Sequence, residues 1–208
     1  ITELADTLNI QFEFIDFGGG LGIPYKPSEE PLDLDLYKDI VMGGFKKFIK
    51  KMEMEGVQFK IEPGRFLSGE ASIILTPVNT VKDNGDKKFA GVDAGFHTLI
   101  RPTMYGSYHH IEKCDKTNEG EMTTYDVAGP ICESGDILGK KRELPQLLEG
   151  DYLAILDAGA YGLTMSSPYN SRPRPAEVLV NEGKDYLVRE AESLDDLLRH
   201  QVIPDHLK

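Results

Sequence analysis

The sequence predicts two kinds of structure in series, an α/β segment over residues 1–70 and a mostly antiparallel β domain over residues 71–208. The first prediction depends on a strand–helix–strand pattern, which is typical of a parallel sheet or barrel. The second depends on short runs of apolar and β-branched residues that are separated by turn signals. With 208 residues the chain is long enough to bury a hydrophobic core, as one large domain or two small ones.

The α/β segment is expected to contain two helices and two strands. Residues 1–9 resemble the end of a helix, and residues 12–17 (Phe-Glu-Phe-Ile-Asp-Phe) predict a buried strand. An amphipathic helix follows, with Asp33 as its N-cap. Its apolar residues recur at three- and four-residue steps: Leu34, Tyr37, Val41, Phe45, Phe48 and Met52. Apolar and polar residues alternate over residues 57–61, which predicts a second strand with Lys60 facing away from the core.

The β domain is expected from residue 71 onward. Apolar runs predict strands at residues 73–78, 153–156 and 177–180. Turn signals lie at residues 83–86, 118–120 and 181–183. A helical pattern returns only at residues 191–199.

Composition narrows the classes of partner. The chain has 23 basic and 35 acidic residues, a formal net charge of −12. Nucleic acids and anionic membranes require clustered Lys and Arg, so neither is expected as a partner. No apolar run has the length of about 18 residues that a transmembrane helix needs.

The first residues have neither a signal-peptide pattern nor an initiator Met, so we expect the chain to be a piece of a longer protein. The two cysteines, Cys114 and Cys132, give no disulfide framework, which favours a reducing, cytoplasmic location.

Four glycine-containing motifs suggest chemistry: Gly-Gly-Gly-Leu-Gly at residues 18–22, Glu-Pro-Gly-Arg at 62–65, Gly-Pro-Ile-Cys-Glu-Ser-Gly-Asp at 129–136 and Asp-Ala-Gly-Ala-Tyr-Gly at 157–162. The first follows a predicted strand, so its amides either face an anion or form a plain tight turn. In the second, Glu62 and Arg65 either form a structural salt bridge or contact a ligand. In the third, Cys132 lies on a glycine-flanked loop rather than in a core strand.

In this order and spacing the motifs resemble the diaminopimelate decarboxylases, a family of pyridoxal-phosphate enzymes. The resemblance implies that residues 1–70 form the final part of a (β/α)8 barrel and residues 71–208 a C-terminal β-barrel or sandwich domain. A complete barrel needs about 250 residues. We therefore expect the lysine that carries the cofactor to lie upstream, and the 208-residue chain by itself to be inactive.

The resemblance also implies roles for individual residues around the cofactor. The backbone amides of Gly19, Gly20 and Gly64 would hold the cofactor, with its phosphate at Gly19 and Gly20, and Tyr161 would add a hydroxyl. Glu62, in a segment with Pro63 and Gly64, would contact the pyridine nitrogen and keep it protonated, so that the ring accepts the electrons left by CO2. Arg65 would hold the phosphate or the substrate carboxylate, because a guanidinium group binds both bidentately.

The remaining residues would recognise the substrate, with Tyr161 close by. Arg101 and Tyr105 match positions that grip its carboxylate, although an Arg before Pro is usually a surface residue. Cys132 would return a proton to the α-carbon in the active site of a partner subunit, which implies a homodimer with shared active sites. Glu133 would accept the distal ammonium group, and Glu rather than Asp at this position favours diaminopimelate over ornithine.

Alternatives stay open. The protein could decarboxylate another basic amino acid, ornithine or arginine. It could also be a non-catalytic regulatory relative, because no lysine here lies in a cofactor-binding motif. A metal site of His109, His110 and Cys114 lacks a suitably spaced fourth ligand, so none is expected. The segment of residues 94–99, with His97 and Thr98, has no assigned role.

Overall fold

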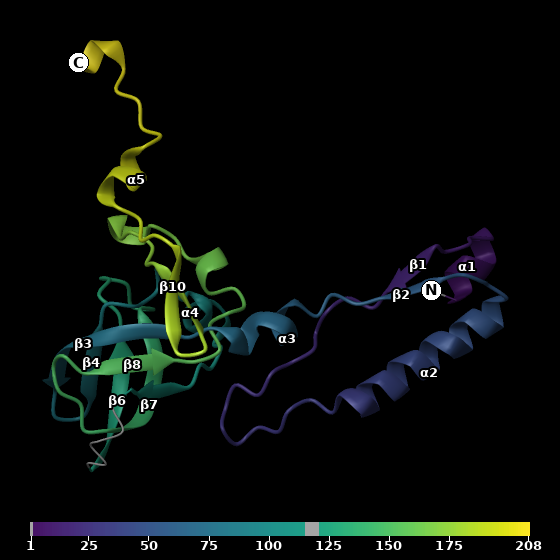
Figure 1. Ribbon diagram of the computed structural model, residues 1–208, viewed down its shortest axis with the longest axis horizontal. Coiled ribbons are helices and arrows are strands. Elements are labelled where there is room, and N and C mark those ends of the chain that lie inside the picture. Colours follow the sequence, from purple (N-terminus) through teal and green to yellow (C-terminus); the bar gives the residue numbers. More distant parts are fainter. Residues whose placement is uncertain (1, 115–120) are drawn as a thin grey trace.

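The computed structural model describes residues 2–114 and 121–208. The turn expected at residues 118–120 lies outside this range. Figure 1 shows two lobes joined by extended chain, a small α/β lobe and a larger β lobe from which the C-terminal residues extend. None of the described helices combines the length and the apolar composition that crossing a bilayer requires.

The α/β lobe has the predicted order of elements. It consists of α1 (Thr2–Leu8), β1 (Phe14–Asp16), α2 (Leu34–Met52) and β2 (Gln58–Lys60). β1 and β2 pair in parallel, with Ile15 opposite Phe59, which confirms the strand–helix–strand unit. Asp33 is the N-cap of α2, because its Oδ1 accepts a hydrogen bond from the amide of Leu36 at 2.9 Å.

The prediction of a buried strand at residues 12–17 is wrong in length and in burial. β1 has three residues, of which only Ile15 is buried, and Phe14 is 47% exposed. The reason is that α2 covers one face of the two-stranded sheet, where the rings of Phe45 and Phe59 lie 5.4 Å apart. On the opposite face Lys60 Nζ lies 3.8 Å from the centroid of the Phe14 ring, so Lys60 does face away from the packed side.

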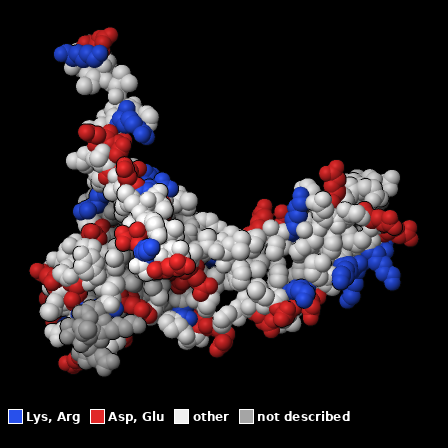
Figure 2. All heavy atoms as spheres, viewed as in Figure 1, with Lys and Arg blue, Asp and Glu red and all other residues white. Residues whose placement is uncertain are grey.

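Basic side chains gather at the C-terminal end of α2, where Figure 2 shows a blue cluster. Lys50 and Lys51 lie in the last turn of this helix. Cations there complement the partial negative charge of the helix C-terminus, so the cluster stabilises the helix end in an otherwise acidic chain.

The β lobe contains one six-stranded sheet in the order β5-β8-β3-β4-β6-β7. Its strands are β3 (Ile74–Asp83), β4 (Lys88–Val92), β5 (Ile111–Lys113), β6 (Met122–Ala128), β7 (Ile137–Pro145) and β8 (Tyr152–Ile155). Every neighbouring pair is antiparallel except β4 and β6, which are parallel. The mostly antiparallel character is therefore confirmed.

The sheet curls until its edge strands β5 and β7 contact each other. Its concave face encloses the hydrophobic core, which includes Val78, Val92, Tyr125, Leu138, Leu153 and Ile155. The parallel pairing of β4 and β6 requires a long connection, residues 93–121, and this connection contains α4 (Arg101–Tyr105) and β5.

Short elements complete the chain. α3 (Gly64–Ser68) and η1 (Gly69–Ala71) lead from β2 into the sheet, and η2 (Leu163–Met165) and η3 (Tyr169–Ser171) follow β8. The hairpin of β9 (Glu177–Asn181) and β10 (Lys184–Arg189) precedes α5 (Leu194–Leu198) and η4 (Asp205–Leu207). The turns predicted at residues 83–86 and 181–183 both connect antiparallel strands, and Ser193 caps the predicted last helix.

Candidate active site

Four chain segments meet around a cavity of about 510 Å³ between the two lobes. Its lining residues are Gly19, Gly20, Leu21, Glu62, Pro63, Gly64, Arg65, Arg101, Tyr105, Ser107, Tyr161 and Met165. Every residue predicted for the cofactor and for the substrate carboxylate is in this set, whereas Cys132 and Glu133 are not. A second hollow of about 550 Å³ at the C-terminal end of α2 contains none of the predicted site residues.

The loop of residues 18–22, here called the glycine loop, forms one wall of the cavity. Gly18 and Gly20 have φ angles of 71° and 87°, which only glycine adopts without strain. A Cβ at Gly19 would lie 2.5 Å from the carbonyl oxygen of Glu62, and the amide of Glu62 donates to the carbonyl oxygen of Gly18 at 2.8 Å. Within the described part of the chain the amides of Gly19 and Gly20 have no hydrogen-bond acceptor, so they fit an anionic group such as a phosphate.

Gly64 contributes differently. Its amide donates to the carbonyl oxygen of Glu62 at 2.9 Å, so this donor is already used and is not free for the cofactor, contrary to the expectation from the sequence. A Cβ at Gly64 would lie 3.9 Å from the hydroxyl oxygen of Tyr161, which shows how closely the two sides of the cavity approach. Tyr161 itself has a left-handed backbone with φ of 62°, a strained conformation for a bulky residue and one that is frequent at functional sites.

The charged groups of the cavity do not neutralise one another. Among the described residues no ion pair involves Glu62, Arg65 or Arg101. The alternative of a structural Glu62–Arg65 salt bridge is therefore not supported. One carboxylate and two guanidinium groups remain available to a ligand.

Arg101 is the most informative of these residues. It is only 5% exposed, contrary to the usual surface position of an Arg before Pro. Its Nη1 donates to the hydroxyl oxygen of Tyr25 at 2.9 Å and its Nη2 to Oγ of Ser107 at 3.4 Å. The guanidinium carbon lies 5.6 Å from the ring centroids of Tyr25 and Tyr161. A buried cation is costly unless an anion compensates it, which indicates that the cavity receives an anionic group.

Tyr25 and Ser107 are site residues that sequence reasoning missed. Tyr25 lies in the long irregular segment between β1 and α2, far in sequence from the arginine it contacts. No motif marks either residue, so only the folded chain reveals them.

The loop of residues 129–136, here called the cysteine loop, lies outside the cavity lining. Cys132 is exposed, and its Sγ accepts a hydrogen bond from Nδ2 of Asn170 at 3.6 Å. Glu133 is half-buried, and its Oε1 accepts a hydrogen bond from the amide of Gly135 at 3.2 Å. The structure thus brings the predicted proton donor and the predicted ammonium acceptor together on one loop, separate from the other site residues.

Asp136 holds this loop, a role the sequence did not predict. Its carboxylate is buried and accepts hydrogen bonds from the amides of Phe96 at 2.5 Å and Ile131 at 2.7 Å. A Cβ at Gly129 would collide with the same carboxylate, so glycine is required there. Oγ1 of Thr103 donates to the carbonyl oxygen of Gly135 and so ties the loop to α4, which carries Arg101.

Two histidines near these segments are buried. His109 is fully buried and its Nδ1 contacts the carbonyl oxygen of Leu156 at 2.9 Å. Burial lowers the pKa of His109 below its ordinary value, and burial together with Arg172 lowers the pKa of His97. Nε2 of His110 lies 3.2 Å from Oε1 of Glu112. In residues 2–114 and 121–208 no three His, Cys, Asp or Glu side chains are grouped to hold a metal ion.

Comparison with known proteins fits this arrangement. The family model described as "Pyridoxal-dependent decarboxylase, C-terminal sheet domain" matches residues 12–159. The chain belongs to this family of decarboxylases. The match extends across the predicted boundary at residues 70 and 71, which stays a prediction.

Several curated relatives are named diaminopimelate decarboxylase. The diaminopimelate decarboxylase of Methanothermobacter thermautotrophicus is 54% identical over 205 residues, which are 99% of this chain and 48% of the relative. That of Archaeoglobus fulgidus is 44% identical over 203 residues, 97% of this chain and 48% of the relative. The chain therefore spans about half the length of the curated relatives it matches.

Solved structures agree. The diaminopimelate decarboxylase of M. jannaschii in complex with L-lysine has a TM-score of 0.88 and 38% identity, over 100% of this chain and 47% of that chain. A lysine/ornithine decarboxylase from Vibrio vulnificus, complexed with putrescine, has a TM-score of 0.68 and 21% identity over 83% of this chain and 45% of that chain. At this identity the likeness concerns the fold alone.

Proposed function

We propose that the protein to which this chain belongs is a pyridoxal-phosphate enzyme that decarboxylates meso-2,6-diaminopimelate to L-lysine and CO2. The observation that carries the proposal is the cavity in which the glycine loop, Glu62 and the buried Arg101 meet. The curated relatives named diaminopimelate decarboxylase support the substrate. On this proposal the curled sheet is the C-terminal β-barrel domain and residues 1–70 complete a (β/α)8 barrel.

The residues of the cavity fit the cofactor. The free amides of Gly19 and Gly20 would receive the phosphate, with the hydroxyl of Tyr161 beside them. The carboxylate of Glu62 would hold a proton on the pyridine nitrogen. Pyridoxal phosphate, when bound, supplies an electron sink for the electrons that remain when CO2 leaves.

Arg101 and Arg65 would bind the anionic groups of the substrate and the cofactor. Arg101 is held by Tyr25 and Ser107, so its orientation is set before a ligand arrives, and it would bind a carboxylate of the substrate together with Tyr105. Arg65 would bind the phosphate or the substrate. Glu133 would receive the distal ammonium group of the substrate.

Cys132 would act as the proton donor from a second subunit. Because Cys132 is absent from its own chain's cavity, we infer a homodimer in which each subunit completes the other's site. The S–H bond breaks as a C–H bond forms at the α-carbon, and the thiolate that remains is reprotonated from water. The exposed thiols of Cys114 and Cys132 suit a reducing cytoplasm.

The full-length protein tests the function. Diaminopimelate should be turned over, and Cys132→Ala should lower turnover by about a hundredfold while the cofactor's visible absorbance is retained. Turnover of ornithine or arginine instead would refute the substrate, and no turnover with any basic amino acid would favour a regulatory relative.

The shared site has its own test. Cys132→Ala and Arg101→Met should each be inactive, but a mixture of the two unfolded and refolded together should recover about a quarter of wild-type activity, because mixed dimers contain one intact site. A mixture as inactive as its components would refute the shared site.

A further inference from the structure

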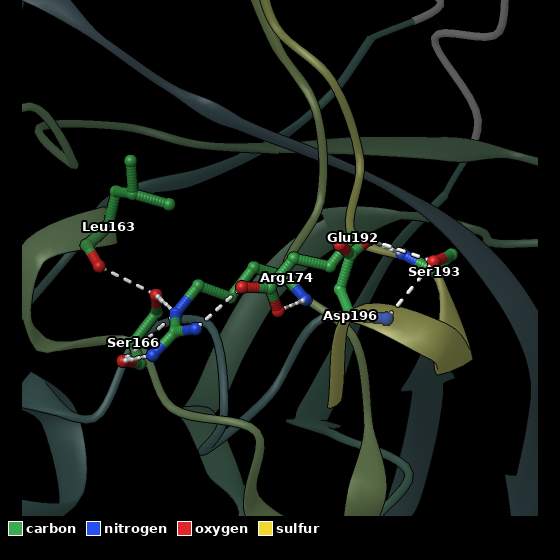
Figure 3. A network of polar contacts seen from close by, with 6 residues as sticks. All are labelled: Leu163, Ser166, Arg174, Glu192, Ser193 and Asp196. Atoms are coloured by element: carbon green, nitrogen blue, oxygen red, sulfur yellow. Dashed lines mark hydrogen bonds and ion pairs between the residues drawn. The ribbon is translucent and has the colours of Figure 1, made fainter. Parts of the chain in front are cut away.

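The loop of residues 166–174 is closed at its base by one side chain. Arg174 Nε donates to Oγ of Ser166 at 3.0 Å and Nη2 donates to the carbonyl oxygen of Ser166 at 3.2 Å. Glu192 holds the arginine in turn, since its Oε1 lies 2.7 Å from Nη1 and its Oε2 accepts the amide of Arg174 at 2.9 Å. Figure 3 shows the guanidinium between Ser166 and Glu192. The two ends of the loop are therefore fixed to each other.

The same loop shares its support with the cysteine loop. The amide of Ser167 donates to the carbonyl oxygen of His97 at 3.0 Å, and the ring of Tyr169 packs against Phe96 with 5.2 Å between centroids. Phe96 is also the residue whose amide donates to Asp136. The segment around Phe96 thus lies beneath both loops and sets their relative position.

The tip of the loop has an unusual backbone. Asn170 and Ser171 have φ angles of 55° and 56°, two consecutive left-handed residues without a glycine. Asn tolerates this region better than most residues, but Ser does not. Such strain persists only where the surrounding structure enforces it, and here it aims Nδ2 of Asn170 at Sγ of Cys132, 3.6 Å away.

We propose that this loop is a positioning element for Cys132 and that Asn170 is the residue that orients its thiol. This inference rests on the proposed function of Cys132 as the proton donor. An N–H group that donates to Sγ occupies a lone pair, so the S–H bond points away from Asn170 and is left for proton transfer. The same N–H dipole stabilises the negative charge that develops on sulfur as the proton leaves.

The test uses two variants that both accept a left-handed backbone. Asn170→Gly removes the donor, and Asn170→Asp replaces it with a carboxylate of the same shape. In the full-length protein the thiols are alkylated with iodoacetamide over a series from about pH 6 to about pH 9, and the peptides are quantified by mass spectrometry. Cys114 serves as the internal reference and Asn181→Ala, at the exposed end of β9, as the control variant.

At neutral pH, labelling of Cys132 should fall about threefold in Asn170→Gly and about tenfold in Asn170→Asp, with Cys114 unchanged. In Asn170→Gly the value of kcat should fall about tenfold with KM unchanged. Cys132 labelling equal to wild type in both variants would overturn the role of Asn170. Wild-type turnover in Cys132→Ala would refute the proton donor itself, whatever the labelling shows.

Discussion

Replacing Asp136 by Asn should loosen the cysteine loop locally. The side chain keeps its shape but exchanges one oxygen for an NH2 group. Because both carboxylate oxygens accept buried amides, from Phe96 and Ile131, one amide must then face a donor. An unsatisfied buried group costs about 1–3 kcal/mol, and a charged acceptor makes the lost bond stronger than average, so the expected cost is about 3 kcal/mol.

Hydrogen exchange followed by mass spectrometry measures this cost where it arises. About 3 kcal/mol corresponds to roughly a hundredfold faster exchange in the peptides that contain Phe96 and Ile131. Asp126→Asn is the matched control, since Asp126 is also buried and accepts one amide, that of Lys141 at 2.8 Å. The control should keep wild-type protection at Lys141, because the one oxygen of Asn can still accept that amide. Protection of both peptides equal to wild type in Asp136→Asn would refute the reasoning.

Two further predictions concern the cavity and the buried histidines. Gly19→Ala should weaken pyridoxal-phosphate binding in an absorbance titration by about tenfold, because its Cβ would lie 2.5 Å from the Glu62 carbonyl oxygen. In the control variant Gly22→Ala the new Cβ meets no atom within 4 Å, so this variant should bind the cofactor normally. Equal affinities of the two variants would contradict the prediction. Burial lowers the pKa of His109, so the unfolded chain binds more protons once the pH falls to about 6.5, and the free energy of unfolding should decrease by up to about 1.4 kcal/mol per pH unit. Urea unfolding at about pH 7.5 and about pH 5.5 should show a smaller decrease for His109→Gln, and an unchanged difference would count against the assignment.

Local signals predicted the elements that depend on local structure. α2 begins directly after Asp33, as predicted. The signals for this helix, an N-cap residue and an apolar stripe, lie in the helix itself and in the residue that precedes it, so the sequence shows them directly. The strand around Ile15 was predicted too long, since an apolar run carries no information about whether a second layer covers its other face. The glycine motifs indicated the cavity, because two backbone segments that approach closely require glycine, as at Gly19.

The residues that hold the site residues in place, Tyr25 and Asp136, could not be predicted, because their contacts join positions far apart in the sequence. Tyr25 reaches Arg101 across 76 positions, and Asp136 reaches Phe96 across 40. Neither contact imposes a spacing or a residue pattern on the chain. Gly95 and Gly129 must both lack a side chain beside the Asp136 carboxylate, but a single glycine in a sequence does not say which group lies against it.

The single parallel pair, β4 and β6, has a consequence for the order in which the protein becomes functional. The hairpin of β3 and β4 closes over a few residues, but β6 can join β4 only after the whole excursion of residues 93–121 has been placed. Pairings between distant positions form slowly, because the entropy of loop closure opposes them before any contact compensates it. The excursion carries Arg101, so the pocket for an anion does not exist on a chain that has made only its local hairpins. We therefore expect a pocket that contains Arg101 to form after the local hairpins, because residues 93–121 must be placed first.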